Sequence, residues 1–209
     1  MDLRDLVPTP NERGIIVGCT GSGKTVLGTH LVAYYRRVIA IDPKGTLGAG
    51  GERWGGHLRG YELASTPWEL ERIARKHDRV QYRPDMKFQN PDDWERVFSW
   101  IFRRGKTMVF TDEIADTHHH SFPPISLRRI ITSGRELGIG HLGATQRPRH
   151  IDKRIMSEAE RYYIFHLRDL DDRRLLKHRM GTGRLPSYAF WYSRDKEPFL
   201  DPEAKKLRL

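Results

Sequence analysis

The chain has 209 residues, which is enough for one hydrophobic core without support from disulfides or a structural metal. Its formal net charge of +10 predicts a polyanionic partner, with nucleic acid ahead of an anionic membrane surface. The chain has one cysteine and no signal-peptide pattern, which excludes a disulfide-rich secreted protein. It has no apolar run approaching about 18 residues, which excludes a membrane span. We therefore expect an intracellular protein.

Short apolar runs rich in β-branched residues alternate with helix-length segments along the chain. We predict buried strands at 14–17, 38–41, 108–111, 142–145 and 162–165, with additional short strands at 80–82 and 188–192. We predict helices at 24–37, 68–77, 92–103, 125–137 and 148–159. This alternation indicates an α/β fold with a mostly parallel sheet. We therefore expect one domain over 1–209, with its core at about 12–170 and a basic C-terminal extension with a terminal strand at about 171–209.

A phosphate-binding motif follows the first predicted strand and opens the first predicted helix. It matches the pattern G-x-x-x-x-G-K-[ST] with the residues Gly18, Cys19, Thr20, Gly21, Ser22, Gly23, Lys24 and Thr25. Glycines allow backbone N–H groups to surround a β-phosphate, and the helix directs its positive amino end toward it. Lys24 is expected to contact the β- and γ-phosphates, and the Thr25 hydroxyl to bind Mg²⁺. The motif predicts a nucleotide site for ATP with Mg²⁺.

Two carboxylates end the predicted strand at 108–111. Asp112 at the strand tip fits an outer-sphere role in holding the magnesium ion, and Glu113 fits the general base that activates a water molecule. An acidic turn in solvent is the alternative interpretation, which the upstream phosphate motif disfavours. The second carboxylate indicates an ATP hydrolase rather than a kinase-like transferase.

A polar residue also ends the predicted strand at 142–145. Gln146 follows Thr145, and the carboxyl edge of a parallel sheet is where a γ-phosphate would lie. We predict that Gln146 senses the γ-phosphate or holds the attacking water.

These elements and their spacing resemble the FtsK–HerA superfamily of ATPases that move nucleic acid. Two further segments support the resemblance: residues 41–45, with the sequence Ile-Asp-Pro-Lys-Gly, and residues 133–139, with the sequence Ser-Gly-Arg-Glu-Leu-Gly-Ile. The resemblance covers about 12–170. It implies a RecA-like P-loop NTPase with helices on both faces of the sheet, strand order 5-1-4-3-2, and a homo-oligomeric ring that is a hexamer or a pentamer.

The size of the chain narrows the function that this resemblance implies. The membrane, barrel and nuclease regions that accompany larger members do not fit before residue 12 or after residue 170. We therefore expect an ATP-hydrolysing DNA translocase similar to the small genome-packaging motors of membrane-containing icosahedral viruses. Such a motor would act on double-stranded DNA in the host cytoplasm, would associate with virions, and would dock on capsid-vertex or viral membrane proteins. The alternatives are a HerA-like helicase, a conjugation-type DNA pump, and a nucleotide-gated DNA-binding or partitioning switch.

A ring ATPase needs a positive group delivered across the subunit interface. Arg135 is our first candidate for that catalytic arginine, with Arg128 and Arg129 as alternatives and Arg147 as a sensor. Surface ion pairing is the competing interpretation for each of them.

Three further segments carry weaker signals. The histidines at 118–120 lack metal-ligand spacing and fit a solvated loop better than a metal site. The glycine-rich stretch 45–60 and the stretch 180–184 are candidate pore loops. The basic residues around 173–184 fit either contact with a phosphate backbone or a solvated helix face.

Overall fold

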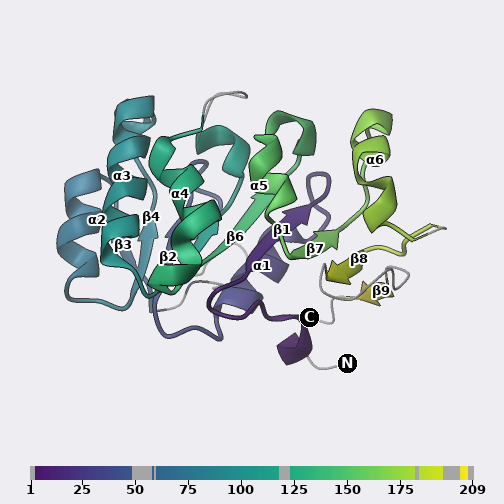
Figure 1. The fold of residues 1–209 in the computed structure, drawn as a ribbon, viewed down its shortest axis with the longest axis horizontal. Coiled ribbons are helices and arrows are strands. Elements are labelled where there is room, and N and C mark those ends of the chain that lie inside the picture. Colours follow the sequence, from purple (N-terminus) through teal and green to yellow (C-terminus); the bar gives the residue numbers. More distant parts are fainter. Residues whose placement is uncertain are drawn as a thin grey trace.

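The computed structural model describes residues 3–48, 58, 60–117, 123–181, 184–194 and 203–206. One nine-stranded sheet, in the order β3-β4-β2-β5-β6-β1-β7-β8-β9, runs through the molecule (Figure 1). The pairs formed among β1 to β7 are all parallel, whereas β8 pairs with β7, and β9 with β8, in the antiparallel direction. The strands are β1 (Arg13–Val17), β2 (Val38–Ile41), β3 (Glu62–Ala64), β4 (Arg79–Tyr82), β5 (Thr107–Thr111), β6 (Ile139–Thr145), β7 (Arg161–Ile164), β8 (Ala189–Arg194) and β9 (Glu203–Lys206).

The predicted α/β class is confirmed. The five core strands predicted from the sequence are β1, β2, β5, β6 and β7, and their order across the sheet is the expected 5-1-4-3-2. The sheet is wider than expected because β4 and β3 extend it beyond β2, and β8 and β9 extend it beyond β7. The short strands predicted at 80–82 and 188–192 correspond to β4 and β8, whereas β3 and β9 were not predicted.

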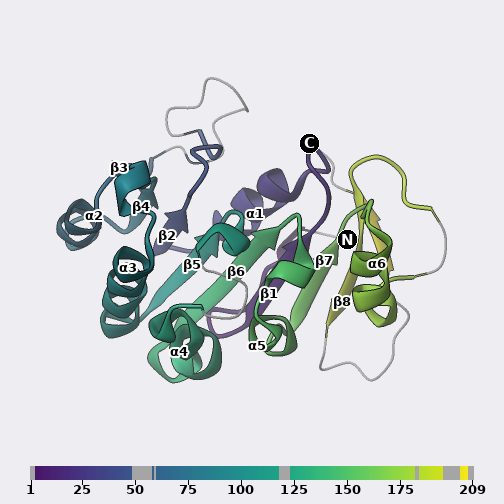
Figure 2. The same ribbon diagram turned by 90° about the horizontal axis from the view of Figure 1, so that it is seen from above.

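Helices cover both faces of the sheet (Figure 2). The α-helices are α1 (Lys24–Val32), α2 (Pro67–Ala74), α3 (Pro91–Arg104), α4 (Ile125–Ser133), α5 (Lys153–Ser157) and α6 (Leu170–Leu176). The short 3-10 helices are η1 (Leu3–Leu6), η2 (Met86–Phe88), η3 (Ile114–Thr117), η4 (Gly134–Leu137), η5 (Pro148–His150) and η6 (Lys177–Arg179). None of the helices in these described ranges is long and apolar enough to cross a membrane.

Four of the predicted helices are shorter than expected, and the one predicted at 68–77 is α2, which ends at Ala74. The helix predicted at 24–37 ends at Val32, and Arg36 and Arg37 instead bind Asp78 where the chain turns into β2. The helix predicted at 125–137 continues beyond Ser133 as 3-10 turns. The helix predicted at 148–159 divides into η5 and α5, because the Asp152 carboxylate accepts a bond from the backbone N–H of Arg154 and begins a new helix there.

Two apolar layers enclose the sheet, because successive side chains of a strand point to opposite faces. On one face Ile15 and Val17 of β1 pack with the helices from α2 to α6, and on the other Ile16 packs with α1. Gly28 permits the close approach of α1: a Cβ atom there would lie 2.4 Å from the Phe110 ring on β5. This contact sets the distance between α1 and the central strands. It therefore also fixes the position of residues 18–23, which precede α1.

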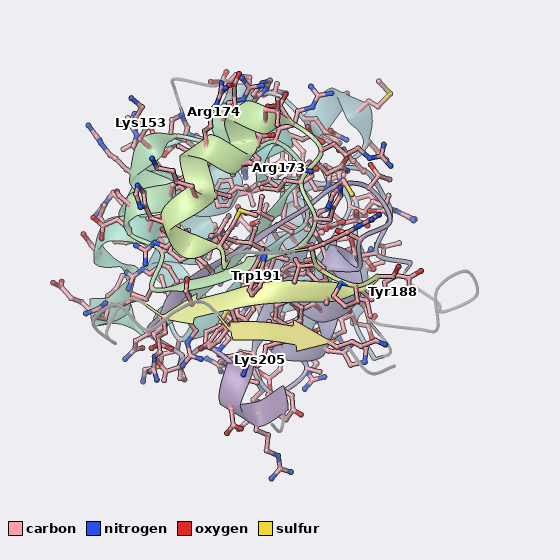
Figure 3. All side chains as sticks on the ribbon, turned by 90° about the vertical axis from the view of Figure 1, so that its right-hand side faces the viewer. Lys153, Arg173, Arg174, Tyr188, Trp191 and Lys205 are labelled. Atoms are coloured by element: carbon pink, nitrogen blue, oxygen red, sulfur yellow. The ribbon has the colours of Figure 1, made fainter. Side chains whose placement is uncertain are left out.

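The C-terminal strands close the β7 end of the sheet (Figure 3). A buried ion pair joins this end to the N-terminal segment, since Arg161 Nε lies 2.7 Å from Glu12 Oε2. Arg194 of β8 binds the other carboxylate oxygen at 2.9 Å. Despite the cost of burial, these partners and the Thr9 N–H lower the pKa of Glu12 to about 2. Removing Glu12 would leave the buried Arg161 without its carboxylate, which is strongly destabilising.

A buried histidine makes stability depend on pH. His141 on β6 is fully enclosed, and its Nε2 lies 3.2 Å from Thr111 Oγ1. Burial, reinforced by the charge of Arg13, lowers the pKa of His141 to about 3, so the folded protein keeps this ring neutral. The unfolded chain takes up a proton below pH of about 6.5, so the unfolding free energy should fall by about 1.4 kcal/mol per pH unit as the pH drops below that value.

Urea denaturation at pH 6.5 and pH 5 measures this dependence. We expect the wild type to lose about 2 kcal/mol between these values through His141, and His141→Gln to lack that loss. His178→Gln, at an exposed position, should retain the wild-type dependence. Equal pH dependence in wild type and His141→Gln would contradict the assignment.

Candidate active site

The predicted phosphate loop lies at the carboxyl edge of the sheet. Residues 18–23 connect β1 to α1, and their backbone is tied to the neighbouring strands: the Gly18 N–H donates to the Thr145 carbonyl at 3.2 Å, and the Cys19 N–H to the His166 carbonyl at 3.0 Å. Gly23 has φ 104°, a conformation that favours glycine. The loop therefore leads directly into the amino end of α1, where backbone N–H groups have no partner within the helix.

Lys24 is a buried cation at the start of α1. The residue is 7% exposed, and its Nζ donates to the Cys19 carbonyl at 2.9 Å. Burial lowers the pKa of Lys24, and the charges of Glu113 and Asp112 oppose that shift. An anion in the loop would stabilise the ammonium group further, because it restores the electrostatic stabilisation that burial removes. The arrangement fits a phosphate group.

Asp112 and Thr25 form a pair of hard oxygen ligands. Thr25 Oγ1 donates to Asp112 Oδ1 at 3.1 Å, and Thr46 Oγ1 donates to Asp112 Oδ2 at 2.9 Å. Burial raises the pKa of Asp112, an effect that the two hydroxyl donors oppose, and a cation beside the carboxylate would oppose it as well. The described residues contain no cluster of three or more His, Cys, Asp or Glu side chains for a metal. A hydroxyl and one carboxylate suit Mg²⁺, which usually keeps several waters and takes other ligands from substrate phosphates.

Glu113 is buried beside Asp112 and faces the end of β6. Its Oε1 accepts a bond from Thr145 Oγ1 at 2.7 Å, and the backbone N–H of Gln146 lies 3.2 and 3.3 Å from the two carboxylate oxygens. Its backbone has φ 62°, which few residues other than glycine adopt. The turn after β5 thus places this carboxylate against Thr145 at the end of β6 and against Gln146, which follows it, as the predicted roles of Glu113 and Gln146 require.

The segment after β2 adds a lysine to the site that sequence analysis had not assigned to it. Lys44 Nζ lies 3.3 Å from Glu113 Oε2 and 3.2 Å from Asp116 Oδ2. Although burial opposes it, the charges of these two carboxylates raise the pKa of Lys44. The segment is held by the buried Asp42 carboxylate, which accepts bonds from the N–H groups of Thr46 and Leu47. The Asp-Pro-Lys-Gly segment was the sequence signal that could have placed Lys44 near the site, although not its contact with Glu113.

A cleft of about 370 Å³ opens beside the phosphate loop. Cys19 and Thr20 of the loop line it together with Gln146, Arg147 and Arg168. Thr20 Oγ1 donates to Gln146 Oε1 at 2.6 Å, which joins the loop directly to the predicted sensor. The structure therefore brings the loop, Lys24, Thr25, Asp112, Glu113 and Gln146 together at one edge.

Arg135 lies at the opposite edge of the sheet. It belongs to η4, before β6, and forms an ion pair with Glu160, before β7, while its side chain remains 55% exposed. The length of β6 separates it from the phosphate loop by about 20 Å. Arg135 cannot reach the site of its own chain, and its role toward a neighbouring subunit stays a prediction. Of the alternatives, Arg129 stacks on the Phe102 ring at 4.2 Å.

The basic residues near the C-terminus lie partly on α6, where Figure 3 shows Arg173 and Arg174. Both have local partners: Arg173 Nε donates to the Leu167 carbonyl at 2.6 Å, and Arg174 pairs with Asp171 at 2.8 Å. DNA contact by this region stays a prediction. The histidines at 118–120 lie outside the described residues, as do most of the loop at 45–60 and residues 182–183 of the second candidate pore loop.

Solved structures of viral packaging proteins have the same fold. The genome-packaging NTPase B204 from Sulfolobus turreted icosahedral virus 2, in complex with AMPPCP, aligns with a TM-score of 0.74 and 16% identity over 96% of this chain and 100% of that chain. The DNA-packaging ATPase B204 from Sulfolobus turreted icosahedral virus aligns with a TM-score of 0.72 and 18% identity over 96% and 100% of the two chains. This chain therefore has the P-loop NTPase fold that its motifs predicted.

A secretion ATPase extends the comparison. The cytoplasmic domain of the type VII secretion ATPase EccC from Thermomonospora curvata aligns with a TM-score of 0.58 and 12% identity, over 95% of this chain and 24% of that chain. No protein-family model and no curated protein sequence matches the chain. The fold is thus shared with ATPases whose sequences are only distantly similar to this one.

The pairing of Thr25 with Asp112 generates a test of metal binding. Replacing Thr25 with valine removes a hydroxyl but keeps the shape of the side chain. We expect Mg²⁺ to strengthen ATP binding in the wild type. In Thr25→Val the gain in ATP affinity from Mg²⁺ should be at least about tenfold smaller, because the metal loses one inner ligand. Titration calorimetry with and without Mg²⁺ measures both affinities.

Thr132→Val, on the exposed side of α4, is the matched control and should bind as the wild type does. If Mg²⁺ strengthens ATP binding equally in Thr25→Val and the wild type, Thr25 does not bind the metal.

Proposed function

We propose that the chain is an ATPase whose hydrolytic site is the cluster at the carboxyl edge of the sheet. The observation that carries the proposal is the burial of Lys24 between the phosphate loop and the adjacent carboxylates Asp112 and Glu113. A buried ammonium at a helix amino end favours a phosphate ligand, and a second buried carboxylate next to it provides a base. The nucleotide complexes of B204, which has the same fold, support this assignment.

In the proposed reaction, the phosphate loop and Lys24 bind the β- and γ-phosphates. Thr25 and Asp112 would hold Mg²⁺, which supplies charge neutralisation on the phosphates when bound. Glu113 accepts a proton from water as the water oxygen bonds to the γ-phosphorus. The bond between that phosphorus and the bridging oxygen breaks, and the products are ADP and phosphate. Gln146 orients the water or the γ-phosphate from the end of β6.

The same proposal extends to a motor that packages double-stranded viral DNA as a ring. Its support is the packaging role named for B204, together with a net charge of +10 that suits a polyanionic substrate. The distance of Arg135 from its own phosphate loop also fits a ring, because an arginine at the amino edge can complete only the site of a neighbouring subunit. Hexamer and pentamer are both compatible with this arrangement.

Two substitutions separate nucleotide binding from hydrolysis. Lys24→Ala should weaken ATP binding by about 100-fold or more, because charge-assisted bonds to phosphate are lost. Glu113→Gln should bind ATP as the wild type does and hydrolyse it at least about 100-fold more slowly, because only proton acceptance is lost. A fluorescent ATP analogue measures binding, and phosphate release measures turnover.

Lys153→Ala removes a positive charge from the exposed surface of α5 and should change neither quantity. Unchanged ATP affinity in Lys24→Ala would refute the assignment of the phosphate loop.

Mixing two inactive variants tests the ring. Arg135→Ala subunits keep Lys24, and Lys24→Ala subunits keep Arg135, so a mixed ring contains complete sites at their shared interfaces. We expect each variant alone to be nearly inactive and the mixture to recover part of the wild-type ATPase rate. Added double-stranded DNA should raise that rate, and the stimulation should decline with salt as phosphate contacts are screened.

If every mixture stays inactive while the wild type is active in the same buffer, Arg135 is not the arginine that acts across the interface. Arg128 and Arg129 would then be the next variants to mix. An ATPase rate that is slow and unaffected by DNA would instead favour a nucleotide-gated switch.

A further inference from the structure

Lys44 joins the proposed general base to the solvent boundary. Its Nζ lies 3.3 Å from Glu113 Oε2 and 3.2 Å from Asp116 Oδ2. The two carboxylates differ in exposure: the Glu113 side chain is buried, whereas those of Lys44 and Asp116 are 42% and 40% exposed. An anion arriving from solvent can therefore reach the ammonium group without displacing the buried carboxylate first.

The hydrogen bonds of Glu113 leave it poorly prepared to accept a proton. Oε1 already accepts bonds from the Thr145 hydroxyl and the Gln146 N–H, and Oε2 accepts from that same N–H and from Lys44. A general base needs a free lone pair directed at the water, and Lys44 occupies an acceptor position on Oε2 that the water would need. Of these donors to Glu113, the ammonium of Lys44 lies at the end of a long, partly exposed side chain, and it is the donor that can most easily be drawn away.

The backbone around Lys44 is tied to the rest of the site by hydrogen bonds. Asp42 anchors both sides of the segment, because its carboxylate accepts bonds from the Thr46 and Leu47 N–H groups and from Gln81 Nε2. A change at Lys44 would consequently alter the surroundings of Glu113 without rearranging the loop.

We propose that Lys44 is a positioning residue that restrains Glu113 in a resting orientation, and that a phosphate group binding to Lys44 releases the carboxylate for water activation. The inference rests on the proposed ATPase function. The phosphate belongs to the DNA backbone, because a γ-phosphate is present in every ATP-bound site, whereas a DNA phosphate is present only when DNA is bound. A partly exposed ion pair exchanges readily, and a phosphate is a better partner for an ammonium than a carboxylate that has other donors.

The test compares steady-state ATPase kinetics of the full chain with and without double-stranded DNA. Lys44→Met removes the charge and keeps the side-chain length, and Lys44→Gln is a second, polar variant in case the first folds poorly. We expect both to raise the DNA-independent kcat at least threefold, with KM for ATP within twofold of the wild type. Lys44→Arg should stay close to the wild type, and so should Lys153→Met, which removes an equivalent charge from the exposed surface of α5.

The response to DNA tests the source of the phosphate. If a DNA phosphate releases Glu113, the stimulation by DNA should largely disappear in Lys44→Met, because the carboxylate is already free. A raised basal rate that keeps its full stimulation by DNA would show that DNA accelerates hydrolysis through another contact, and would overturn the DNA phosphate as the releasing group.

Three results would overturn the inference. A folded Lys44→Met or Lys44→Gln with an unchanged or lower basal kcat would show that Lys44 does not restrain Glu113. A tenfold rise in KM at unchanged kcat would make Lys44 a substrate-binding residue instead. A wild type without ATPase activity contradicts the proposed function, and this inference with it, whereas an active wild type with unaccelerated variants contradicts the inference alone.

Discussion

The arrangement of buried charge at the carboxyl edge of the sheet is the constraint on which the site depends. Lys24, Asp112 and Glu113 are all almost fully enclosed, and burial disfavours the charged forms of Lys24 and Asp112. Each is therefore stabilised by the opposite charges beside it and by donors such as the hydroxyls that bind Asp112. Such a cluster has few stable arrangements, because a buried charge without a partner costs several kcal/mol. The charged side chains that would bind a phosphate and activate water thus also determine which local conformations are stable.

The parallel sheet makes this cluster possible by ending its strands together. β1, β5 and β6 end at Val17, Thr111 and Thr145, and pairing places Val17 beside Thr145 and Thr111 beside Gly143. The residues after these strands therefore meet, although they come from three separate parts of the chain. The close contact of Gly28 with Phe110 then sets the position of α1, and with it Lys24 and Thr25. A larger side chain at position 28 would move the helix away from the carboxylates.

Sequence patterns predicted the parts of this structure that rest on short-range chemistry. The apolar runs identified the core strands, and the phosphate motif, the Asp112–Glu113 pair and Gln146 were expected at the edge where they lie.

β3 was missed because it has three residues and two of them are exposed, so it lacks an apolar run. The beginning of α6 was signalled by Asp169, whose carboxylate accepts bonds from the Asp171 and Asp172 N–H groups, but its surface-facing sequence lacks a clear apolar face. The contact of Lys44 with Glu113 joins residues 69 positions apart, and no spacing rule predicts such a side-chain bond.

The proposed function requires the buried cluster to bind the phosphates of a magnesium nucleotide. A crystal or cryo-electron microscopy structure of Glu113→Gln with ATP and Mg²⁺ would show whether it does, since slow hydrolysis should preserve the bound substrate. We expect the β-phosphate within residues 18–23, the metal at the Thr25 hydroxyl, and the γ-phosphate between Lys24 and Gln146. A nucleotide bound elsewhere on the chain, or with its phosphates away from Lys24, would rule out this phosphate site.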